Sequence, residues 1–405
     1  MNSMEAIPET RFGTLRTRAL QGGKLRLFHV AAPTVFEGSG ITQLAPRLCR
    51  ALIKLGHQVE LHVLAPAAPG AKDVCSLTEH QSWPAAGRLG FSWSFAAAIA
   101  RAAKTADVIH VHSLWMWPNI FPGWLNPRES APIVIAPQGT LSIWALKQSR
   151  VQKAIAWWLL GQRLALRRAA CLQATAKSEY DDLRRCGFHQ PIAIIPNGID
   201  LPGLPPHPAP KSERRILLFM SRIHPKKGLD TLINAWANVA HRFPDWDLEV
   251  VGPPDPPSYL SEMQALADRV ALGRVAFRQA AYGTAKSEAL WRADLFALPT
   301  RSDNFAIVVA EALAHGVPVI TTREAPWQGL ETERCGWWIE DSLEAVTAAL
   351  DDALSLDRGV LAEMGERGRT WVERDFGWDH IALQLSEVYL WLLGRGGKPE
   401  FVIVE

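Results

Sequence analysis

The sequence predicts an α/β fold made of two successive domains, each built on a doubly wound parallel sheet. Short apolar runs alternate with segments of helical period along almost the whole chain, which is typical of parallel strands covered by helices on both faces. Five prolines fall within residues 201–212, where almost nothing can be buried, and the alternation starts again after them. This proline-rich segment is therefore interpreted as an interdomain linker.

The first half of the chain reads as strand, glycine loop, helix and strand. Residues 25–31 form a short apolar run, and a loop with Gly38 and Gly40 follows it. Residues 41–55 carry leucines on one side at helical spacing, and residues 57–65 complete a βαβ unit. Glycines in such a loop let a backbone or a phosphate approach closely, although many such loops are simply tight turns. Further strands are expected at 108–112, 133–136 and 193–195.

The second half repeats the alternation without a sequence repeat. Strands are expected at 216–221, 248–251, 275–278, 295–298 and 317–321, with helices at 228–242, 259–272, from 285 and at 306–315. Open parallel sheets bind ligands beyond the carboxyl ends of their strands. Two such sheets are expected to face each other across a cleft lined by the loops that follow the strands.

Composition excludes several classes of protein. Forty-three Lys and Arg residues against forty-one Asp and Glu residues give a net charge of +2, which argues against nucleic acid as the main partner. The five cysteines are scattered and form no CxxC pair, so neither a disulfide framework nor a zinc site is indicated. Residues 1–12 lack the basic start and apolar run of a signal peptide, and no run of 18 apolar residues occurs. We therefore expect a cytoplasmic protein.

One segment is unusually basic. No Asp or Glu lies between Glu129 and Glu179, and tryptophans accompany the basic residues there. A basic, Trp-bearing helix can lie in an anionic membrane interface, which predicts peripheral contact with the inner face of the membrane. The alternative is a domain helix with one buried apolar stripe and a solvated basic face. The segment contains Lys147, Arg150, Lys153, Arg163, Arg167, Arg168 and Lys177, together with Trp144, Trp157 and Trp158.

Two pairs of charged residues follow strands of the second half. Arg222 and Lys227 come after the first strand and just before a helix, where two cations suit a diphosphate, although a solvated basic turn would look the same. Asp303 and Glu311 lie eight positions apart across a helix start, so they could hold hydroxyls at both ends of a nucleotide sugar while the amides between them receive phosphates. The alternative is a helix cap and an ordinary surface charge.

Together these residues resemble the retaining GT-B glycosyltransferases of glycosyltransferase family 4 (group 1), over about residues 24–393. The resemblance is carried by the glycine loop with LGHQV and by IPNGID, SRIHPKKGLDTLINAW and SDNFAIVVAEALAHGVPVI. The segments TREAPWQGL and GWW resemble members that build bacterial surface polysaccharides. The tail FGW resembles the family's C-terminal crossover.

The resemblance implies a domain division and an activity. It implies an acceptor-side Rossmann-like domain over 24–204, a donor domain over 205–377, and a helix over 378–395 that crosses back onto the first domain. The implied reaction moves a sugar from a nucleotide diphospho-sugar, with retention, to a lipid-linked or polysaccharide acceptor in cell-surface or exopolysaccharide biosynthesis. No cofactor is expected.

The resemblance also implies roles for single residues. Arg222 and Lys227 match the pair that neutralises the diphosphate, which is why no divalent metal is expected. Asp303 matches a donor-sugar contact and Glu311 a ribose contact. The remaining donor-binding candidates are Gly38, Gly40 and the amides of Phe305, Ala306 and Ile307.

The sequence departs from the family pattern at three positions. Asp303 is one methylene shorter than the usual Glu, and Ala306 stands where a Gly usually follows the Phe. Gln138 stands where many members have a His or Arg near the reacting sugar, and it can donate a hydrogen bond but cannot carry charge. Two alternatives therefore remain open, namely a nucleotide-sugar epimerase of similar architecture and a catalytically degenerate protein that binds nucleotide sugar.

Two histidines form a further candidate. His110 and His112 alternate along one predicted strand, where they could bind a metal. The alternative is a structural role, with one side chain facing the core and the other the cleft.

Overall fold

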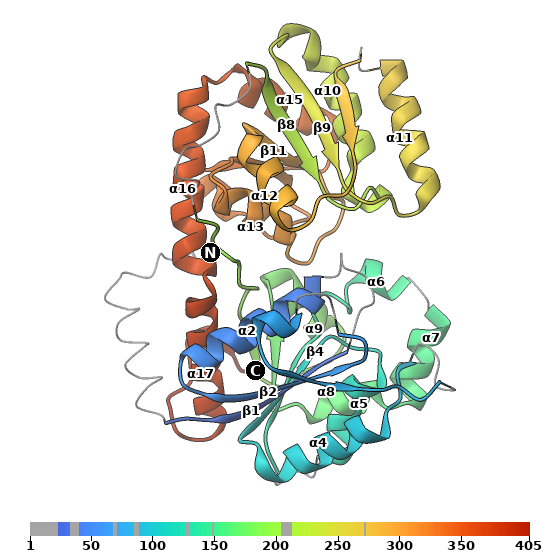
Figure 1. Cartoon of the computed structure of the whole chain (residues 1–405), viewed down its shortest axis with the longest axis vertical. Coiled ribbons are helices and arrows are strands. Elements are labelled where there is room, and N and C mark those ends of the chain that lie inside the picture. Colours follow the sequence, from blue (N-terminus) through green and yellow to red (C-terminus); the bar gives the residue numbers. More distant parts are fainter. Residues whose placement is uncertain are drawn as a thin grey trace. The chain divides into compact units, whose positions relative to one another are not determined.

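The computed structural model describes residues 23–32, 40–67, 71–84, 89–126, 130–147, 150–203, 213–270 and 273–405 (Figure 1). The chain divides into two compact units. Unit 1 contains Met1–Gly198 and Trp378–Glu405, and unit 2 contains Ile199–Gly377. The last segment of the chain thus returns to unit 1. Most of the proline-rich segment that was interpreted as a linker, residues 204–212, lies outside the described residues.

Unit 1 is built on an eight-stranded sheet in the order β14-β7-β6-β5-β4-β1-β2-β3. All neighbouring pairs are parallel except β14 and β7, which are antiparallel. The strands are β1 Arg26–Ala31, β2 Gln58–Leu64, β3 Leu77–His80, β4 Val108–His112, β5 Ile133–Ala136, β6 Cys171–Ala174, β7 Ile192–Ile194 and β14 Val402–Ile403. The helices are α2 Gly40–Lys54, α3 Ala71–Val74, α4 Trp93–Thr105, α5 Trp117–Leu125, α6 Ile143–Lys147, α7 Arg150–Ala154, the π-helical turn η2 Ile155–Leu159, α8 Gln162–Arg168, α9 Lys177–Arg185 and α17 Trp378–Leu392.

The C-terminal helix α17 is part of the core of unit 1. It packs against α2 on one face of the sheet, while α4, α5 and α8 pack together. Leu385, Val388 and Tyr389 of α17 are fully buried in one cluster with Leu27 and Val134 of the sheet. Burying such apolar side chains stabilises a fold by roughly 1.5–3 kcal/mol each. Helix α17, which comes from the far end of the sequence, is therefore needed to complete the core of unit 1.

Unit 2 is built on a six-stranded parallel sheet in the order β10-β9-β8-β11-β12-β13. The strands are β8 Arg215–Met220, β9 Trp246–Val251, β10 Val275–Arg278, β11 Leu295–Leu298, β12 Val319–Thr322 and β13 Gly336–Ile339. The helices are the 3₁₀ turn η3 Pro225–Lys227, α10 Leu229–Val239, the 3₁₀ turn η4 Ala240–Arg242, α11 Pro257–Val270, α12 Gly283–Arg292, α13 Ile307–Ala314, α14 Gly329–Thr332, α15 Leu343–Ser355 and α16 Arg358–Phe376.

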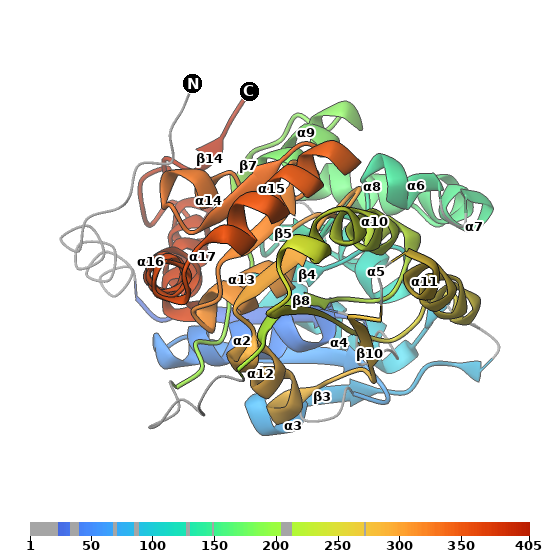
Figure 2. The same cartoon turned by 90° about the horizontal axis from the view of Figure 1, so that it is seen from above.

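Helices cover both faces of the unit 2 sheet. Helix α10 packs against α11 and α15, and α13 packs against α16 on the other side of the sheet (Figure 2). The strands β8 and β11 lie at the centre, and nearly all of their side chains are buried. Such central strands read as continuous apolar runs because neither face meets water. For this reason the positions of these two strands could be predicted from the sequence.

The predicted fold class is confirmed, because each unit is a doubly wound parallel α/β sheet. The strands expected at 108–112, 133–136, 275–278 and 295–298 occupy those residues. Strand β6 was not expected, since CLQA is short and follows a basic segment. The structure begins unit 2 at Ile199, whereas the expected boundary stood at 204/205.

Candidate functional site

Two of the basic residues after β8, Lys226 and Lys227, lie on a short 3₁₀ turn, η3, which Gly228 caps, while Arg222 precedes the turn. Gly228 has a φ of 69°, and a Cβ on it would lie 1.9 Å from the carbonyl oxygen of Pro299. Only glycine fits this close approach, which packs the turn against the loop that follows β11. The turn begins at His224, whose Nδ1 accepts a hydrogen bond from the Lys226 amide at 3.0 Å. The sequence therefore fixes the direction in which this turn leaves the strand.

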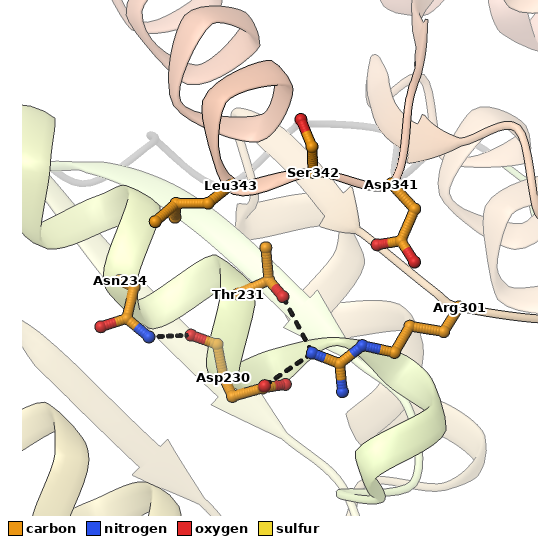
Figure 3. A pocket seen from close by; sticks show the side chains of 7 residues that line it. All are labelled: Asp230, Thr231, Asn234, Arg301, Asp341, Ser342 and Leu343. Atoms are coloured by element: carbon orange, nitrogen blue, oxygen red, sulfur yellow. Dashed lines mark hydrogen bonds and ion pairs between the residues drawn. The ribbon is translucent and has the colours of Figure 1, made fainter.

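Arg301 holds the same turn from the loop after β11. Its backbone amide donates to the carbonyl oxygen of Lys226, and its Nη1 donates to the carbonyl oxygen of Pro225, both at 2.8 Å. Its Nη2 also pairs with Asp230 at 2.6 Å, beside a polar cavity of about 300 Å³ (Figure 3). Asp341 lies across this cavity from Arg301. Arg301 thus ties η3 to the first turn of α10.

Lys227 and Asp303 form an ion pair with both side chains largely buried. Burial by itself would raise the pKa of the Asp303 carboxyl group. The nearby charges of Lys227 and Lys226, with hydrogen bonds from Lys227 and the Ala306 amide, outweigh burial and hold that pKa below its usual value. Burial lowers the pKa of Lys226 to about 8, and Lys227 and Arg222 act in the same direction against the opposing effect of Asp303. The Asp303 carboxyl group is therefore ionised at neutral pH.

Ala306 begins α13 in an unusual conformation. Its φ of 54° lies in the left-handed region, which glycine adopts at a lower cost than alanine. The Ala306 amide donates to Asp303 Oδ1 at 3.1 Å, and Trp327 Nε1 donates to the carbonyl oxygen of Phe305 at 2.6 Å. The amide of Ile307 lies in the first turn of α13, where a helix leaves its N–H groups without intrahelical partners. The start of α13 thus places backbone amides next to the carboxylate of Asp303.

Glu311 lies in the second turn of α13 and pairs with Lys286 of α12. Its second oxygen, Oε2, is buried and has no hydrogen-bond partner among the described residues. A buried acceptor without a partner is costly, by about 1–3 kcal/mol, so this oxygen suits a hydroxyl donor from a ligand.

Arg222 forms an ion pair with Asp255 at 2.7 Å and not with Asp303 or Glu311, and both side chains of this pair are about half exposed.

The structure thus joins some predicted donor-site residues and not others. Lys227 and Asp303 meet directly, whereas Glu311 and Arg222 each pair with a residue that the sequence did not single out. Lys286 belongs to no recognisable motif, so nothing in the sequence indicated it. Arg301 could have been noticed as a further cation beyond the carboxyl end of a buried strand.

Gln138 lies in unit 1, in the loop that follows β5. Its φ is 53° and that of Gly139 is 76°, so two successive residues are left-handed. The Gly139 amide donates to Glu179 Oε1 at 2.6 Å, and the side-chain oxygen of Gln138 is buried without a hydrogen-bond partner among the described residues. The sequence gave no sign that Glu179 supports this loop.

Backbone strain concentrates near Gln138. Of the five described non-glycine residues with positive φ, Ser113 and Trp115 follow β4, and Gln138 follows the neighbouring strand β5. Each such conformation costs on the order of 1–3 kcal/mol, and strain of this kind clusters at functional sites. The carboxyl ends of β4 and β5 are therefore the best candidate for a site in unit 1.

The glycine loop is only partly described. Gly38 lies outside the described residues. Gly40 is the first residue of α2, whereas the sequence analysis placed it in the loop just before the helix.

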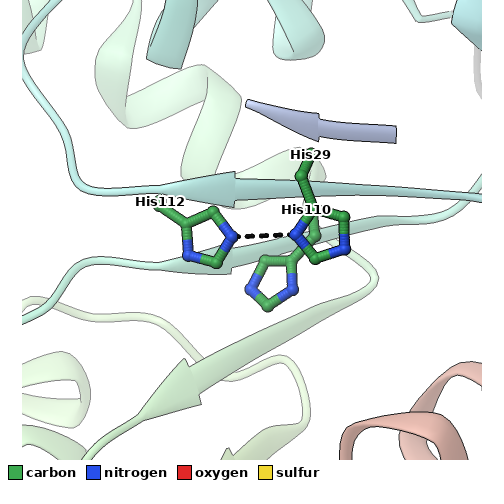
Figure 4. Close-up of side chains that lie close together, drawn as sticks. All are labelled: His29, His110 and His112. Atoms are coloured by element: carbon green, nitrogen blue, oxygen red, sulfur yellow. Dashed lines mark hydrogen bonds between the residues drawn. The ribbon is translucent and has the colours of Figure 1, made fainter. Parts of the chain in front are cut away.

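His110 and His112 stack on one face of the sheet with ring centroids 4.3 Å apart, and His29 of β1 joins them (Figure 4). The expectation that one ring faces the core and the other a cleft is wrong, because residues i and i+2 of a strand point to the same side. His29 Nδ1 lies 3.0 Å from His112 Nε2, and His110 Nδ1 lies 2.7 Å from the Tyr389 hydroxyl. Burial lowers the pKa of His112 to about 4.

One ring nitrogen from each of these three histidines lies within 4.8 Å of the other two, close enough for one metal ion. The cluster contains no carboxylate, so only the three imidazole rings could bind such an ion. Instead, the neutral rings hydrogen-bond to each other and to Tyr389 of α17. We interpret the cluster as a support for α17.

The basic segment forms an exposed surface on unit 1. It is broken into α6, α7, η2 and α8, and neither α6 nor α7 buries a side chain. Val151, Trp158 and Leu159 are 70–75% exposed, and Arg163 lies over the Trp158 ring at 5.2 Å. A single helix with one buried apolar stripe therefore does not describe this segment. None of the helices in the described ranges combines the length and the hydropathy that a bilayer span requires.

Two family models match the chain. The model described as Glycosyltransferase Family 4 matches residues 38–202, and the model described as glycosyl transferases group 1 matches residues 214–355. The first match lies almost wholly in unit 1 and the second lies in unit 2.

Curated relatives include bacterial enzymes that act on inositol compounds. The GDP-mannose-dependent alpha-(1-6)-phosphatidylinositol monomannoside mannosyltransferase of Mycobacterium tuberculosis is 31% identical over 221 residues, which is 48% of this chain and 55% of that protein. The D-inositol 3-phosphate glycosyltransferase of Xylanimonas cellulosilytica is 25% identical over 394 residues, which is 88% of this chain and 93% of that protein. The chain thus spans about half the length of the first of these relatives.

Solved structures match both units together. HepE of Anabaena, in complex with UDP and glucose, superposes with a TM-score of 0.70 at 17% identity over 90% of this chain and 99% of that chain. Sucrose-phosphate synthase of Thermosynechococcus elongatus gives 0.70 at 22% identity over 92% of this chain and 100% of that chain. At these identities the similarity shows the fold.

Proposed function

Because the chain belongs to the group 1 glycosyltransferases of family 4 and has their GT-B fold, we propose that it is a retaining hexosyltransferase. It moves a sugar from a nucleotide diphospho-sugar to a lipid-linked or polysaccharide acceptor in cell-surface or exopolysaccharide biosynthesis. The observation that carries this proposal is the buried Lys227–Asp303 pair at the start of α13, with Glu311 one turn further on.

In this proposal the donor diphosphate binds at the η3 turn. Lys227 and Arg222 supply positive charge, and the first amides of α13 donate hydrogen bonds to phosphate oxygens. Asp303 accepts from hydroxyls of the donor sugar, and Glu311 Oε2 accepts from the ribose. With these lysine and arginine charges at the diphosphate, no divalent metal or cofactor is required.

The transfer step needs no side-chain nucleophile. The bond between the anomeric carbon and the leaving phosphate oxygen breaks, and the acceptor hydroxyl oxygen attacks the same face of the sugar. The leaving phosphate takes the acceptor proton, while Lys227 and Arg222 stabilise the charge that develops on it. This differs from retaining glycosidases, in which a carboxylate forms a covalent intermediate.

Gln138 is assigned a hydrogen bond to a reacting sugar hydroxyl. Its buried side-chain oxygen has no partner among the described residues, and its amide group can also donate. A neutral amide can orient a hydroxyl but cannot stabilise charge as a protonated histidine would. This residue therefore contributes orientation rather than acid–base chemistry.

We further propose that the acceptor is met at the inner face of a membrane. The surface of α7, η2 and α8 presents exposed Val151, Trp158 and Leu159 among basic side chains, a combination that favours an anionic lipid interface. The Mycobacterium relatives are named as mannosyltransferases of phosphatidylinositol compounds, which supports a lipid-linked acceptor.

The donor base is open to experiment, because the Mycobacterium relative is named for GDP-mannose and HepE was solved with UDP. UDP, GDP, ADP and their common sugars should be tested by thermal shift with and without chelator. A ligand at 100 times its dissociation constant adds roughly 2.7 kcal/mol of stability. A base-selective shift that survives the chelator names the donor for assays with candidate acceptors.

Each other outcome has a distinct meaning. Conversion of the donor to a new sugar without an acceptor would identify an epimerase. Nucleotide binding without transfer to any acceptor would indicate a degenerate binding protein, and Gln138→His should then create activity. The absence of any nucleotide shift would contradict the proposed donor site.

A further inference from the structure

We propose that Glu179 is a positioning residue for the transfer reaction and that it acts by holding Gln138 through the backbone of the loop after β5. The inference rests on the proposed function, in which Gln138 hydrogen-bonds a reacting sugar. Glu179 itself touches no substrate. Its carboxylate sets the direction in which the Gln138 side chain leaves the loop.

The Glu179 carboxylate is buried and bonds two separate segments of unit 1. Glu179 lies in the first turn of α9 and is only 1% exposed. One oxygen, Oε2, accepts from both the amide and the hydroxyl of Thr175 at 2.8 Å. The other, Oε1, accepts from the Gly139 amide at 2.6 Å, forty residues earlier in the chain. The carboxylate therefore links the loop after β5 to the start of α9.

The bond to Gly139 constrains Gln138 because of peptide geometry. The N–H of Gly139 belongs to the peptide plane that joins Gln138 to Gly139, so fixing this N–H fixes ψ of Gln138 and φ of Gly139. Both residues are left-handed, with φ values of 53° and 76°. Glutamine pays a steric penalty in that region, so without an external hold the loop would relax to another conformation. The carboxylate supplies that hold.

The loop presents Gln138 in a state suited to a ligand. Its side-chain oxygen is buried and has no hydrogen-bond partner among the described residues. The neighbouring loop after β4 contains two more left-handed residues, Ser113 and Trp115, and the Ser113 amide donates to the carbonyl oxygen of Ala136 at 2.8 Å. Strained backbone and an acceptor without a hydrogen-bond partner among the described residues thus occur together at the carboxyl ends of β4 and β5.

A helix-capping role alone does not account for Glu179. A carboxylate in the first turn of a helix commonly reaches back to an amide before the helix, and the bonds to Thr175 fit that role. Capping uses only Oε2. The second oxygen would face solvent or a local amide in a simple cap, whereas here it holds a strained loop from another part of the sequence.

The test compares Glu179→Gln with the matched variant Thr175→Val. Glutamine has one carbonyl oxygen where the carboxylate has two. Kept toward the amide and hydroxyl of Thr175, which donate two bonds, this oxygen leaves the NH₂ group facing the Gly139 amide, where it cannot accept. Thr175→Val removes one hydrogen bond of the cap and leaves the bond to Gly139. We expect Glu179→Gln to lower kcat about 30-fold and Thr175→Val to lower it less than about 2-fold. The dissociation constant of the nucleotide, which binds unit 2, should stay unchanged in both.

A second variant and a second measurement guard against misfolding. Glu179→Asp keeps a carboxylate for the Thr175 cap but is one methylene too short to reach Gly139, so kcat should fall as in Glu179→Gln. Hydrogen exchange of the Gly139 amide should accelerate at least tenfold in Glu179→Gln and Glu179→Asp and remain slow in Thr175→Val. This readout does not depend on activity.

The outcomes separate the two proposals. Accelerated exchange at Gly139 with kcat unchanged in Glu179→Asp would overturn the positioning role, and so would equal kcat losses in Glu179→Gln and Thr175→Val. If the unmodified protein transfers no sugar, the proposed function fails, and the positioning role fails with it even where the exchange data confirm the bond to Gly139.

Discussion

The two units build their candidate sites by different physical means. In unit 2 the site consists of oppositely charged side chains, Lys227 with Asp303 and Lys286 with Glu311, placed at the start of α13. In unit 1 the site consists of strained backbone around Gln138, held by the carboxylate of Glu179. Charged side chains can be recognised from the sequence. Backbone strain cannot, because it depends on the path that the folded structure imposes on a loop. The residues of the candidate site in unit 2 can therefore be predicted from the sequence, whereas those of the candidate site in unit 1 cannot, although both units have the same kind of fold.

The comparison predicts that changes in unit 2 affect donor binding and charge stabilisation, while changes in unit 1 leave nucleotide affinity intact. The largest expected effect is that of Lys227→Ala. Turnover should fall on the order of 100-fold or more, because the leaving phosphate loses a buried cation where its negative charge develops. Arg222→Ala should act in the same direction. Steady-state kinetics at saturating donor would measure both.

The control for Lys227→Ala addresses its structural role. Removing Lys227 leaves Asp303 as an uncompensated buried carboxylate, which by itself destabilises the fold. The double variant Lys227→Ala/Asp303→Asn removes both charges and should recover much of the lost stability without recovering turnover. Near-normal turnover in Lys227→Ala would refute the assignment of the diphosphate to this turn.

The next effect concerns nucleotide affinity. Glu311→Ala should weaken nucleotide binding about tenfold, because the hydrogen bond from a ribose hydroxyl to a carboxylate is lost. Lys286→Met is the matched control, since it removes the partner of Glu311 while leaving the carboxylate in place. Isothermal titration with the preferred nucleotide measures both variants. Equal affinity in Glu311→Ala and the unmodified protein would count against the ribose contact.

A smaller effect is expected at the basic surface of unit 1. Arg163→Gln should weaken binding to vesicles that contain anionic phospholipid about fivefold, since a basic residue near such a surface contributes on the order of 1 kcal/mol. Arg101→Gln, an exposed basic residue on α4, serves as the control. Cosedimentation gives the binding, and nucleotide affinity should be identical in both variants. A membrane role for this surface fails if Arg163→Gln and Arg101→Gln bind equally.

A separate effect is expected on the pH dependence of stability. The pKa of Lys226 is lowered to about 8 in the folded protein from its ordinary value of 10.5 in the unfolded chain. The unfolded state therefore binds more protons between these two pH values, and the free energy of unfolding should rise with pH across that window. Lys226→Met should flatten the rise, as measured by denaturant unfolding at pH 8 and pH 10. An unchanged slope would contradict a buried lysine at this position.

Much of the fold was predictable because its strands are buried on both faces. The runs at 133–136 and 295–298 are continuously apolar, which only a covered parallel strand requires. Strand β6 escaped because it is four residues long and contains Gln173, whose polar side chain bonds the carbonyl oxygen of Ile195. Burial of a polar group with a specific partner leaves no signature in hydropathy.

The candidate site divides in the same way. Arg222, Lys227 and Asp303 could be selected from the sequence because charged residues soon after buried strands have few structural reasons to be there. Glu311 could be selected by its spacing of eight residues from Asp303 across the start of a helix. Their partners Asp255 and Lys286 could not, since each lies on a different element and meets the site only through the sheet order. Gln138 was noticed only as a departure from a family pattern.

The sequence by itself determined the alternation of strands and helices and the cations and carboxylates at the strand ends, because hydropathy period and residue type are local properties. Tertiary structure alone decided that Lys227 meets Asp303, that α17 completes the core of unit 1, and that Glu179 holds the loop of Gln138. Each of these depends on bringing together segments forty or more residues apart. Such contacts depend on the order of the strands in a sheet and on the path of the connections between them. Local sequence patterns do not specify either.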